Sequence, residues 1–376
     1  MYSAVQVLAL YVPSTSTVLH WKMRSIFISS LLLSLLFYEC IGSVYKIESS
    51  SIGSLKCKVL RNTQTGESST IVTDFGARVE ELILKSSISG KLRSVLLTHN
   101  NNAAAIIENS WWKGMILLPW ANRIAKGQYS FFNEAYQLNV NENSTNPTHV
   151  NALHGLLAGK VFQVANADAT DESAVLGVSY SFPGNEKGYP FKLTVMIEYT
   201  LDKNGFKVGF TIANDMATTP LPFYVGWHPY FACEAYKAYV TLDPCAKWSH
   251  VEMNENFNPT GITNTFKGFD GTTPIGGTSA KPTFYDDEYK VLTSPNDCPR
   301  METKLYDPDS NQTVVLWQDS NFRFVHVFTG SASLFKENAV AIEPMGGMAD
   351  AYNNHDHLSV ISGDEVWKGE FGVYVT

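Results

Sequence analysis

The sequence predicts an all-β protein in which two large sheets pack face to face. Short segments rich in Val, Ile, Phe, Tyr and Thr alternate with turn residues, and no long stretch keeps a helical period. These segments are more numerous than the strands of one twisted open sheet, which favours two packed sheets. With 376 residues and 44% hydrophobic content, the chain is able to bury a large core.

Three pairs of segments carry the pattern of a β-hairpin. In the first pair, Leu193, Val195, Ile197 and Tyr199 alternate on one face before a turn. The predicted hairpins join residues 191–201 to 206–213, residues 313–317 to 322–328, and residues 128–132 to 135–139. Residues 254–285, which are rich in Gly, Thr, Asn and Pro, are predicted to form long loops on this framework.

Residues 1–42 are predicted to be a cleaved secretory signal, and residues 43–376 a single domain. Arg24 precedes the apolar stretch 26–38, and small residues at 40–42 follow where signal peptidase would cut. This stretch is shorter than the roughly 20 residues of a membrane span, so stable membrane insertion is not expected. The alternatives are an uncleaved anchor or a misassigned extension, with Met1 or Met23 as the true start. We therefore expect a secreted protein.

Four cysteines remain after the leader: Cys57, Cys233, Cys245 and Cys298. An even number suits an oxidising compartment. Cys233 and Cys245 are close in sequence and flank a possible turn, so they are predicted to pair, which leaves Cys57 with Cys298. The alternative is four buried thiols. Sequons at Asn143 and Asn311 become glycosylation candidates only if the chain is exported.

Composition and motifs disfavour several classes of partner. The chain has 28 Lys and Arg against 36 Asp and Glu, a net charge of -8, and no long basic run, which disfavours nucleic acids and anionic membranes. It contains no phosphate-cradling glycine loop, no Gly-x-Ser-x-Gly elbow and no Cys-x-x-Cys pair. His355-Asp356-His357 could touch a metal, but spacing places no third ligand. Neither a metal site nor a cofactor is expected.

His228 and Glu343 are the leading candidates for proton chemistry. His228 lies in an aromatic segment, 226–231, in which Pro229 restricts the preceding backbone, and its imidazole can exchange a proton near neutral pH. Glu343 follows an apolar run and precedes Pro344, which predicts a carboxylate at a strand end, where partial burial raises its pKa. The alternatives are a hydrogen-bonded core histidine and a rim glutamate.

Further polar residues suit a sugar site. Arg123, next to Asn122, is a forked cation that could grip vicinal hydroxyls, although a structural salt bridge is equally ordinary. His154 precedes Gly155, which would let a ligand approach the backbone closely. Asp286 could bind hydroxyls, although an acidic trio such as 286–288 is more often a solvated loop.

In kind and order, these segments resemble the aldose 1-epimerase (galactose mutarotase) family. The resemblance rests on residues 119–124, 151–155, 226–231 and 342–353, and it extends from about residue 73 to residue 374. It implies a large antiparallel β-sandwich, often called a supersandwich. It also implies a glutamate that takes the proton of the anomeric hydroxyl and a histidine that protonates the ring oxygen, chemistry that needs neither metal nor redox cofactor.

The resemblance also implies a role for each candidate residue. Glu343 would be the general base and His228 the general acid, while His154 would hydrogen-bond near the ring oxygen. The remaining candidates, Asn122, Arg123 and Asp286, would bind sugar hydroxyls. The expected function is interconversion of the α and β anomers of free aldohexoses such as glucose and galactose.

Departures from the family pattern bear on the substrate. Leu156 stands where many relatives have a second glycine, and residues 345–349 replace a more polar stretch, so the preferred sugar stays open. Related hexose-6-phosphate epimerases usually carry threonine in place of Pro229, which favours an unphosphorylated sugar here. Two alternatives are a non-catalytic sugar-binding protein and a glycoside-cleaving enzyme. The second needs another carboxylate opposite Glu343, for which Asp286 is the placed candidate.

Overall fold

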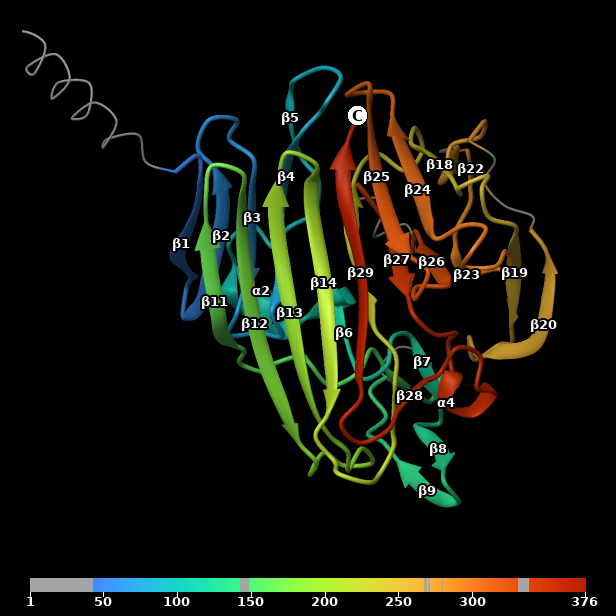
Figure 1. Ribbon diagram of the computed structural model, residues 1–376. Helices are drawn as coiled ribbons and strands as arrows, with labels where there is room; N and C mark the ends of the chain where they lie inside the picture. Colours follow the sequence, from blue (N-terminus) through green and yellow to red (C-terminus); the bar gives the residue numbers. More distant parts are fainter. Residues whose placement is uncertain (1–42, 143–148, 267–268, 270, 279, 331–337) are drawn as a thin grey trace, which may run out of the picture. The chain divides into compact units, whose positions relative to one another are not determined.

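The computed structural model describes residues 43–142, 149–266, 269, 271–278, 280–330 and 338–376. Residues 44–376 form one compact unit of antiparallel sheets, so the predicted all-β fold class is confirmed (Figure 1). The predicted signal segment and the sequon at Asn143 lie outside the described residues. In the described part of the chain, no helix combines the length and the apolarity that crossing a membrane requires.

The first strands of the unit pair in chain order as a five-stranded sheet. They are β1 (Tyr45–Ile52), β2 (Leu55–Asn62), β3 (Ser68–Val72), β4 (Arg78–Lys85) and β5 (Leu92–Ser94). Arg78, at the start of β4, is fully buried and donates to the backbone carbonyl of Ile106 at 3.1 Å. This sheet therefore anchors the segment that follows β5.

A large sheet of eight strands forms one half of the main body. In spatial order its strands are β11 (Gln163–Ala169), β12 (Ser173–Pro183), β13 (Lys192–Asp202), β14 (Gly205–Asn214), β29 (Val366–Val375), β25 (Gln312–Asp319), β24 (Arg300–Asp307) and β18 (Tyr239–Thr241) (Figure 1). The predicted hairpin 191–201 with 206–213 is confirmed as β13 and β14. The four alternating residues of β13 are fully buried, whereas Met196 between them is 40% exposed.

A second eight-stranded sheet carries Asp286 and Glu343, and His228 lies between two of its strands. It contains β20 (Pro259–Thr265), β19 (Trp248–Met253), β23 (Asp286–Val291), β26 (Phe324–Phe328), β27 (Ala339–Met345), β16 (Gly226–Trp227) and β6 (Ile116–Leu117), with β17 (Tyr230–Ala232) also paired to β27. The prediction of loops throughout 254–285 is therefore wrong in part. Strand β20 is almost wholly exposed, so it lacks the buried apolar alternation by which a strand is recognised.

Short pairs and helices complete the described structure. They are β7 (Arg123–Ala125) with β10 (Asn151–Leu153), β8 (Gln128–Phe131) with β9 (Glu134–Gln137), β15 (Leu221–Phe223) with β28 (Ser359–Ile361), β21 (Gly277–Thr278) with β22 (Lys281–Pro282), α2 (Ala103–Glu108), η1 (Ser110–Trp112) and α4 (Ala351–Asn354). The pairing of β8 with β9 confirms the predicted hairpin near residue 133. Asn102 caps the N-terminus of helix α2, and its side chain accepts a hydrogen bond from the N–H of Ala105.

The two eight-stranded sheets share one hydrophobic core. Trp227 of β16 stacks on Phe371 of β29 with ring centroids 5.3 Å apart and an interplanar angle of 9°. Both rings are fully buried, and large aromatic side chains dominate the burial energy of cores. The rigid contact fixes the segment that leads directly into His228.

The hairpin predicted for residues 313–328 is wrong. Strand β25 pairs with β24 and β29, whereas β26 pairs with β23 and β27, so the chain crosses between the two large sheets. Phe322 lies at this crossing, is fully buried, and packs on Phe371 with ring centroids 5.2 Å apart. Insertion of Phe322 into the shared core separates the two strands that the turn signal suggested would pair.

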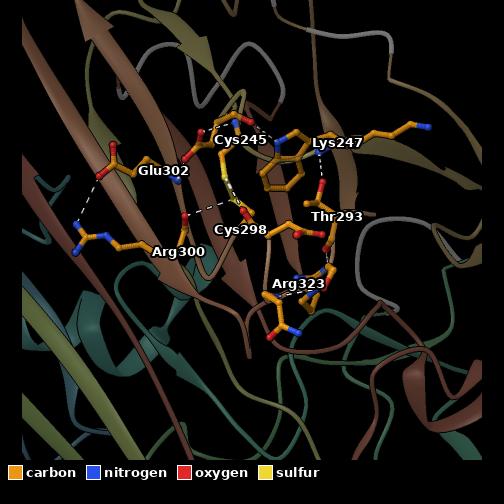
Figure 2. Close-up of a disulfide and its surroundings, with 12 residues drawn as sticks. Cys245, Lys247, Thr293, Cys298, Arg300, Glu302 and Arg323 are labelled. Atoms are coloured by element: carbon orange, nitrogen blue, oxygen red, sulfur yellow. Dashed lines mark hydrogen bonds and ion pairs between the residues drawn. A yellow bond between two sulfur atoms is a disulfide. The ribbon is translucent and has the colours of Figure 1, made fainter.

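The predicted cysteine pairing is also wrong. Cys245 is bonded to Cys298 (Figure 2), and Cys57 and Cys233 are buried free thiols. Strand β18, which lies between positions 233 and 245, pairs with β24 and so carries Cys245 toward the residues just before β24. The Cα atoms of the bonded pair are 5.9 Å apart, within the range usual for disulfides.

Candidate active site

Four titratable side chains lie in one row across the second eight-stranded sheet. Glu288 on β23 is opposite His326 on β26, and His326 is opposite Glu343 on β27. Strands β16 and β17, which flank His228, pair with β27 in a single register that sets His228 opposite Glu343. Directly opposite residues of antiparallel strands point to the same face of a sheet. The row therefore brings four distant parts of the sequence together on one face.

His228 and Glu343 contact each other in this row. His228 Nε2 lies 3.5 Å from Glu343 Oε1, and the two residues are only 4% and 1% exposed. His228 Nδ1 and Glu343 Oε2 have no partner among the described residues. Glu343 lies inside β27, which continues through Pro344 to Met345, and not at the strand end that the sequence predicted.

Burial dominates the electrostatics of this pair. Desolvation, together with the neighbouring imidazole of His326, lowers the pKa of His228 to about 3. Desolvation, assisted by the charge of Asp286, raises the pKa of Glu343 well above its usual value. Burial therefore favours the uncharged form of each group, with a proton on Glu343 rather than on His228. The imidazole of His228, which can accept and release a proton, lies 3.5 Å from the Glu343 carboxyl group.

His154 is held beside His228 by backbone geometry. The two imidazole centroids are 5.0 Å apart, and Trp112 covers His154 with ring centroids 4.9 Å apart. His154 Nδ1 accepts a hydrogen bond from the backbone N–H of Asn122 at 3.2 Å, and burial lowers the pKa of His154 well below its usual value. The neutral ring therefore carries its proton on Nε2 and acts as a donor.

Gly155 does not have the predicted role, which was to let a ligand approach the backbone closely. A side chain there would lie 2.3 Å from the carbonyl oxygen of Leu118, and the glycine has a φ of 73°. The free space at Gly155 is thus taken by the protein's own backbone, not by a ligand. Its close packing supports the unusual left-handed conformation of His154, whose φ is 62°.

Arg123 is clamped between two carboxylates. Its Nη2 lies 2.9 Å from Glu142 and 3.3 Å from Asp286, and Nη1 donates to the side-chain oxygen of Asn122 at 3.3 Å. Burial alone would raise the pKa of Asp286, but Arg123 and His326 outweigh it and hold that pKa well below its usual value. Asp286 is therefore a fixed anion, and the salt bridge that the sequence left open for Arg123 is present.

His326 is a site residue that sequence reasoning missed. It is 3% exposed, its Nε2 lies 2.9 Å from Asp286 Oδ1, and its Nδ1 lies 3.1 Å from the side-chain nitrogen of Asn122. The amide donates to Nδ1, so Nε2 carries the proton and donates to Asp286. In the sequence His326 lies between two valines in an apolar segment, a pattern that is typical of a core residue. Only the pairing of distant strands reveals its neighbours.

One cavity of about 570 Å³ is lined by Asn122, Arg123, His154, His228, Asp286, His326 and Glu343. Of the 18 non-glycine residues with left-handed backbone in the described structure, six line this cavity: Asn109, Trp111, Trp112, Asn122, His154 and Phe257, with φ between 49° and 65°. Such conformations cost on the order of 1–3 kcal/mol each and concentrate at functional sites. Backbone strain and perturbed titratable groups therefore mark the same place.

The acidic and histidine-rich segment near the C-terminus lies elsewhere. Asp356 forms an ion pair with Lys290 at 2.6 Å and contacts the ring of His357 at 2.6 Å. Within the described ranges, no group of three His, Cys, Asp or Glu side chains is arranged to hold a metal ion.

Solved structures with the same architecture identify the fold as galactose mutarotase-like. A galactose mutarotase-like protein from Clostridium acetobutylicum aligns with a TM-score of 0.72 and 18% identity, over 88% of this chain and 98% of that one. An aldose epimerase homologue from Caenorhabditis elegans aligns with a TM-score of 0.67 and 16% identity, over 88% and 99%. The chain belongs to the aldose 1-epimerase family, whose model matches residues 58–373.

Sequence relatives agree with this family. The protein YihR of Escherichia coli (strain K12), described as uncharacterized, is 28% identical over 265 residues, covering 69% of this chain and 78% of YihR. Galactose mutarotase from Rattus norvegicus is 31% identical over 216 residues, covering 54% of this chain and 57% of that enzyme.

Proposed function

We propose that the protein is an aldose 1-epimerase that interconverts the α and β anomers of free aldohexoses such as glucose and galactose. The observation that carries the proposal is the contact of His228 Nε2 with Glu343 Oε1 at 3.5 Å, on the wall of a cavity lined by polar groups. An acid and a base held together in a sugar-sized space suit opening of a hemiacetal, which is a proton-transfer reaction.

In this mechanism Glu343 takes the proton of the anomeric hydroxyl while His228 delivers a proton to the ring oxygen. The ring bond between C1 and the ring oxygen breaks, and an open-chain aldehyde forms. Rotation about the C1 to C2 bond and closure in the reverse sense give the other anomer and restore both protons. The reaction therefore needs one base, one acid and freedom for the aldehyde to rotate.

The resting proton must first be redistributed between the pair. Burial favours the state in which Glu343 is protonated and His228 is neutral. A bound sugar donates hydroxyl hydrogen bonds to the carboxylate, and such bonds lower a carboxyl pKa because they stabilise its charged form. Substrate thus assists transfer of the proton from Glu343 to His228, which lies 3.5 Å away.

The remaining side chains bind and orient the sugar in this proposal. The fixed anion Asp286 accepts hydrogen bonds from hydroxyls, and neutral His154 donates from Nε2 near the ring oxygen. Asn122 braces His154 and His326. Arg123 acts mainly by holding Asp286 and Glu142, since its guanidinium is already engaged by both. Together these contacts define which face of the ring meets the catalytic pair.

Polarimetry of freshly dissolved α-glucose and α-galactose, with and without purified protein, tests the function. We expect the approach to anomeric equilibrium to accelerate in proportion to protein concentration. If isothermal titration calorimetry detects sugar binding but the rate equals the spontaneous rate, the protein is a carbohydrate-binding protein on this fold and the proposed activity is wrong.

We also propose that the protein is exported after removal of residues 1–42. The disulfide between Cys245 and Cys298 supports an oxidising compartment. Glycosylation at Asn311 is supported by the position of this sequon on an exposed turn between β24 and β25. N-terminal sequencing of material from a secreting host tests this proposal, and a mature start at Met1 or Met23 would contradict it.

A further inference from the structure

Three buried ionisable side chains form a cluster outside the residues that line the cavity. Arg78 is fully buried, and Glu80 and His99 are 4% and 9% exposed. Glu80 accepts the backbone N–H of His99 at 2.6 Å and contacts its ring Nδ1 at 2.8 Å, and Arg78 Nε lies 4.0 Å from Glu80. The proposed proton transfer uses none of these three side chains.

Stability does not explain the burial of Arg78. Desolvation lowers the pKa of Arg78 to about 10, although the charge of Glu80 opposes the shift. The Nε atom of Arg78 makes no hydrogen bond within the described part of the chain. Replacing a buried ion pair by well-packed apolar side chains of similar volume is often neutral or stabilising. A guanidinium differs from an apolar side chain in offering a rigid fork of hydrogen-bond donors.

The fork of Arg78 holds both ends of a strained backbone segment. Nη1 donates to the carbonyl oxygen of Ile106 at 3.1 Å, and Nη2 donates to that of Lys113. Between these carbonyls lies Trp112, whose φ of 49° is in the left-handed region that bulky side chains avoid. Such a conformation persists only where surrounding contacts enforce it. Arg78 therefore helps to keep the indole of Trp112 over the imidazole of His154.

The residue after Arg78 links the same strand, β4, to the backbone of His228. The N–H of Val79 donates to the carbonyl of Gly114 at 3.0 Å, and the N–H of Gly114 donates to the carbonyl of His228 at 2.8 Å. The N–H of His228 donates in turn to the carbonyl of Met115 at 2.9 Å. A side chain at Gly114 would lie 2.0 Å from the carbonyl oxygen of Val79, so the two backbones are in close contact. The position of β4 therefore fixes that of the His228 backbone.

Glu80 supports His228 by a second route. It holds His99, and two positions earlier the N–H of Leu97 donates to the carbonyl of Tyr230 at 2.8 Å. The ring of Tyr230 stacks on that of His228, with centroids 4.9 Å apart and an interplanar angle of 13°. Strand β4 thus supports both the backbone and the ring of His228.

We propose that Arg78 is a positioning residue for His228, the proposed general acid. Glu80 orients the guanidinium, which acts through the backbone of residues 113–115. Arg78 does not contact the reacting atoms. It maintains the distance between His228 and Glu343 on which proton transfer depends. The inference rests on the proposed epimerase function and deepens it, because it identifies what holds the acid in place.

Mutarotation kinetics of Arg78→Lys test this role. Lysine keeps the charge, but its ammonium is a point donor that cannot reproduce the fork across two carbonyls. We expect kcat for α-glucose to fall tenfold or more and KM to change less than threefold, since misplacement by about 1 Å can cost on the order of 10²-fold in rate.

Arg93→Lys is a matched control. Arg93 is also buried, pairs with Asp307 at 3.0 Å and donates to a backbone carbonyl, that of Ala232, at 2.6 Å, but it lies outside the cavity and makes no contact with residues 106–115 among its hydrogen bonds in the described structure. Its kcat should stay within twofold of the parent value, even where urea unfolding shows that both variants lose equal stability.

Hydrogen exchange measured by mass spectrometry gives a readout that does not depend on turnover. The amides of Gly114 and His228 should exchange faster in Arg78→Lys than in the parent protein, and at the parent rate in Arg93→Lys. If the parent protein turns over no sugar, the proposed function is wrong, and exchange at these two amides still decides whether Arg78 positions the His228 backbone.

Several results would overturn the proposal while the epimerase activity stands. They are a parental kcat in folded Arg78→Lys, unchanged exchange at both amides, and an equal fall of kcat in Arg93→Lys, which would indicate general destabilisation. Should Arg78→Lys not fold, Glu80→Gln replaces it, because it removes the charge beside Arg78 and keeps an acceptor for His99. Its kcat should fall several-fold, and a parental kcat would again overturn the proposal.

Discussion

His326 on β26 lies directly opposite Glu343 on β27, yet the two side chains form no hydrogen bond with each other. Both ring nitrogens of His326 are engaged sideways, one by Asn122 and one by Asp286. The carboxyl group of Glu343 is therefore left to exchange protons with His228 on its other side. In the proposed mechanism His228 and Glu343 of this row are the catalytic pair and His326 is a positioning residue, so their variants should have distinct phenotypes.

Glu343→Gln and His228→Asn should each lower kcat by about 10² to 10⁴ while the protein stays folded, since positioned acids and bases contribute on that order. Polarimetric kinetics and circular dichroism measure the two properties. His250→Asn is a suitable control, because His250 pairs with Asp287 at 2.7 Å and lies outside the cavity. A folded Glu343→Gln protein with parental turnover would exclude the mechanism.

The pH dependence should differ from that of an exposed histidine, which titrates near pH 6.5. Burial lowers the pKa of His228 to about 3 and raises that of Glu343. His228 thus takes up a proton only as the pH falls toward 3, and burial favours the protonated form of Glu343. We expect kcat/KM, corrected for spontaneous mutarotation, to be flat from pH 7 to pH 5. A limb with its midpoint between pH 5 and 7 would contradict this assignment.

His326 should act on binding through Asp286. His326→Gln can keep a donor for Asp286 and an acceptor for Asn122, so its KM should rise only a few-fold. His326→Leu removes a hydrogen bond to a charged group, worth about 1.5–3 kcal/mol, and should raise KM tenfold or more with a smaller effect on kcat. Equal kinetics for the two variants would show that these hydrogen bonds do not position the site.

Much of the framework was predictable because its signals are local. The alternation of apolar residues in β13 reports directly which face is buried, and the turn 202–205 links it to its neighbour β14. A similar turn signal after β25 gave a wrong hairpin prediction, because a turn signal does not distinguish a hairpin from a crossing between sheets. There the deciding fact is the burial of Phe322 against Phe371, a contact between distant segments.

The site residues also divide into those with a local sequence signal and those that only distant strand pairing reveals. His228, Glu343 and Asp286 stand in segments with recognisable composition, so they could be chosen as candidates. Their partners depend on strand register, which joins residues of different strands and leaves no local trace in the sequence. His326 was missed for this reason, and Cys298 was assigned to the wrong cysteine because closeness in sequence is a poor guide to pairing across a sheet.

Glu288 should make stability depend on pH. It is fully buried, and desolvation raises its pKa to about 8 although the N–H of Ala349 donates to it. The folded state therefore holds a proton that the unfolded state releases from about pH 4.5, and stability from this group falls by about 1.4 kcal/mol per unit as pH rises toward 8.

Glu288→Gln stays neutral and keeps an acceptor for Ala349, so its advantage over the parent protein should grow between pH 5.5 and 7.5. Urea unfolding at both pH values measures this difference. A difference in unfolding free energy that does not change with pH would show that Glu288 titrates normally.

The cysteines give a covalent prediction. Non-reducing peptide mapping should find Cys245 linked to Cys298, with Cys57 and Cys233 as thiols that react only after unfolding, because burial raises their pKa values to about 11 and about 12. The bond joins residues 53 apart, and closing a loop of that size in the unfolded chain typically stabilises a protein by about 2–4 kcal/mol. The double variant Cys245→Ser with Cys298→Ser should therefore unfold at lower urea concentration, while Cys233→Ser should leave the mapped linkage intact. Recovery of a peptide that links Cys233 to Cys245 would refute the strand pairing of β18 with β24 on which this prediction depends.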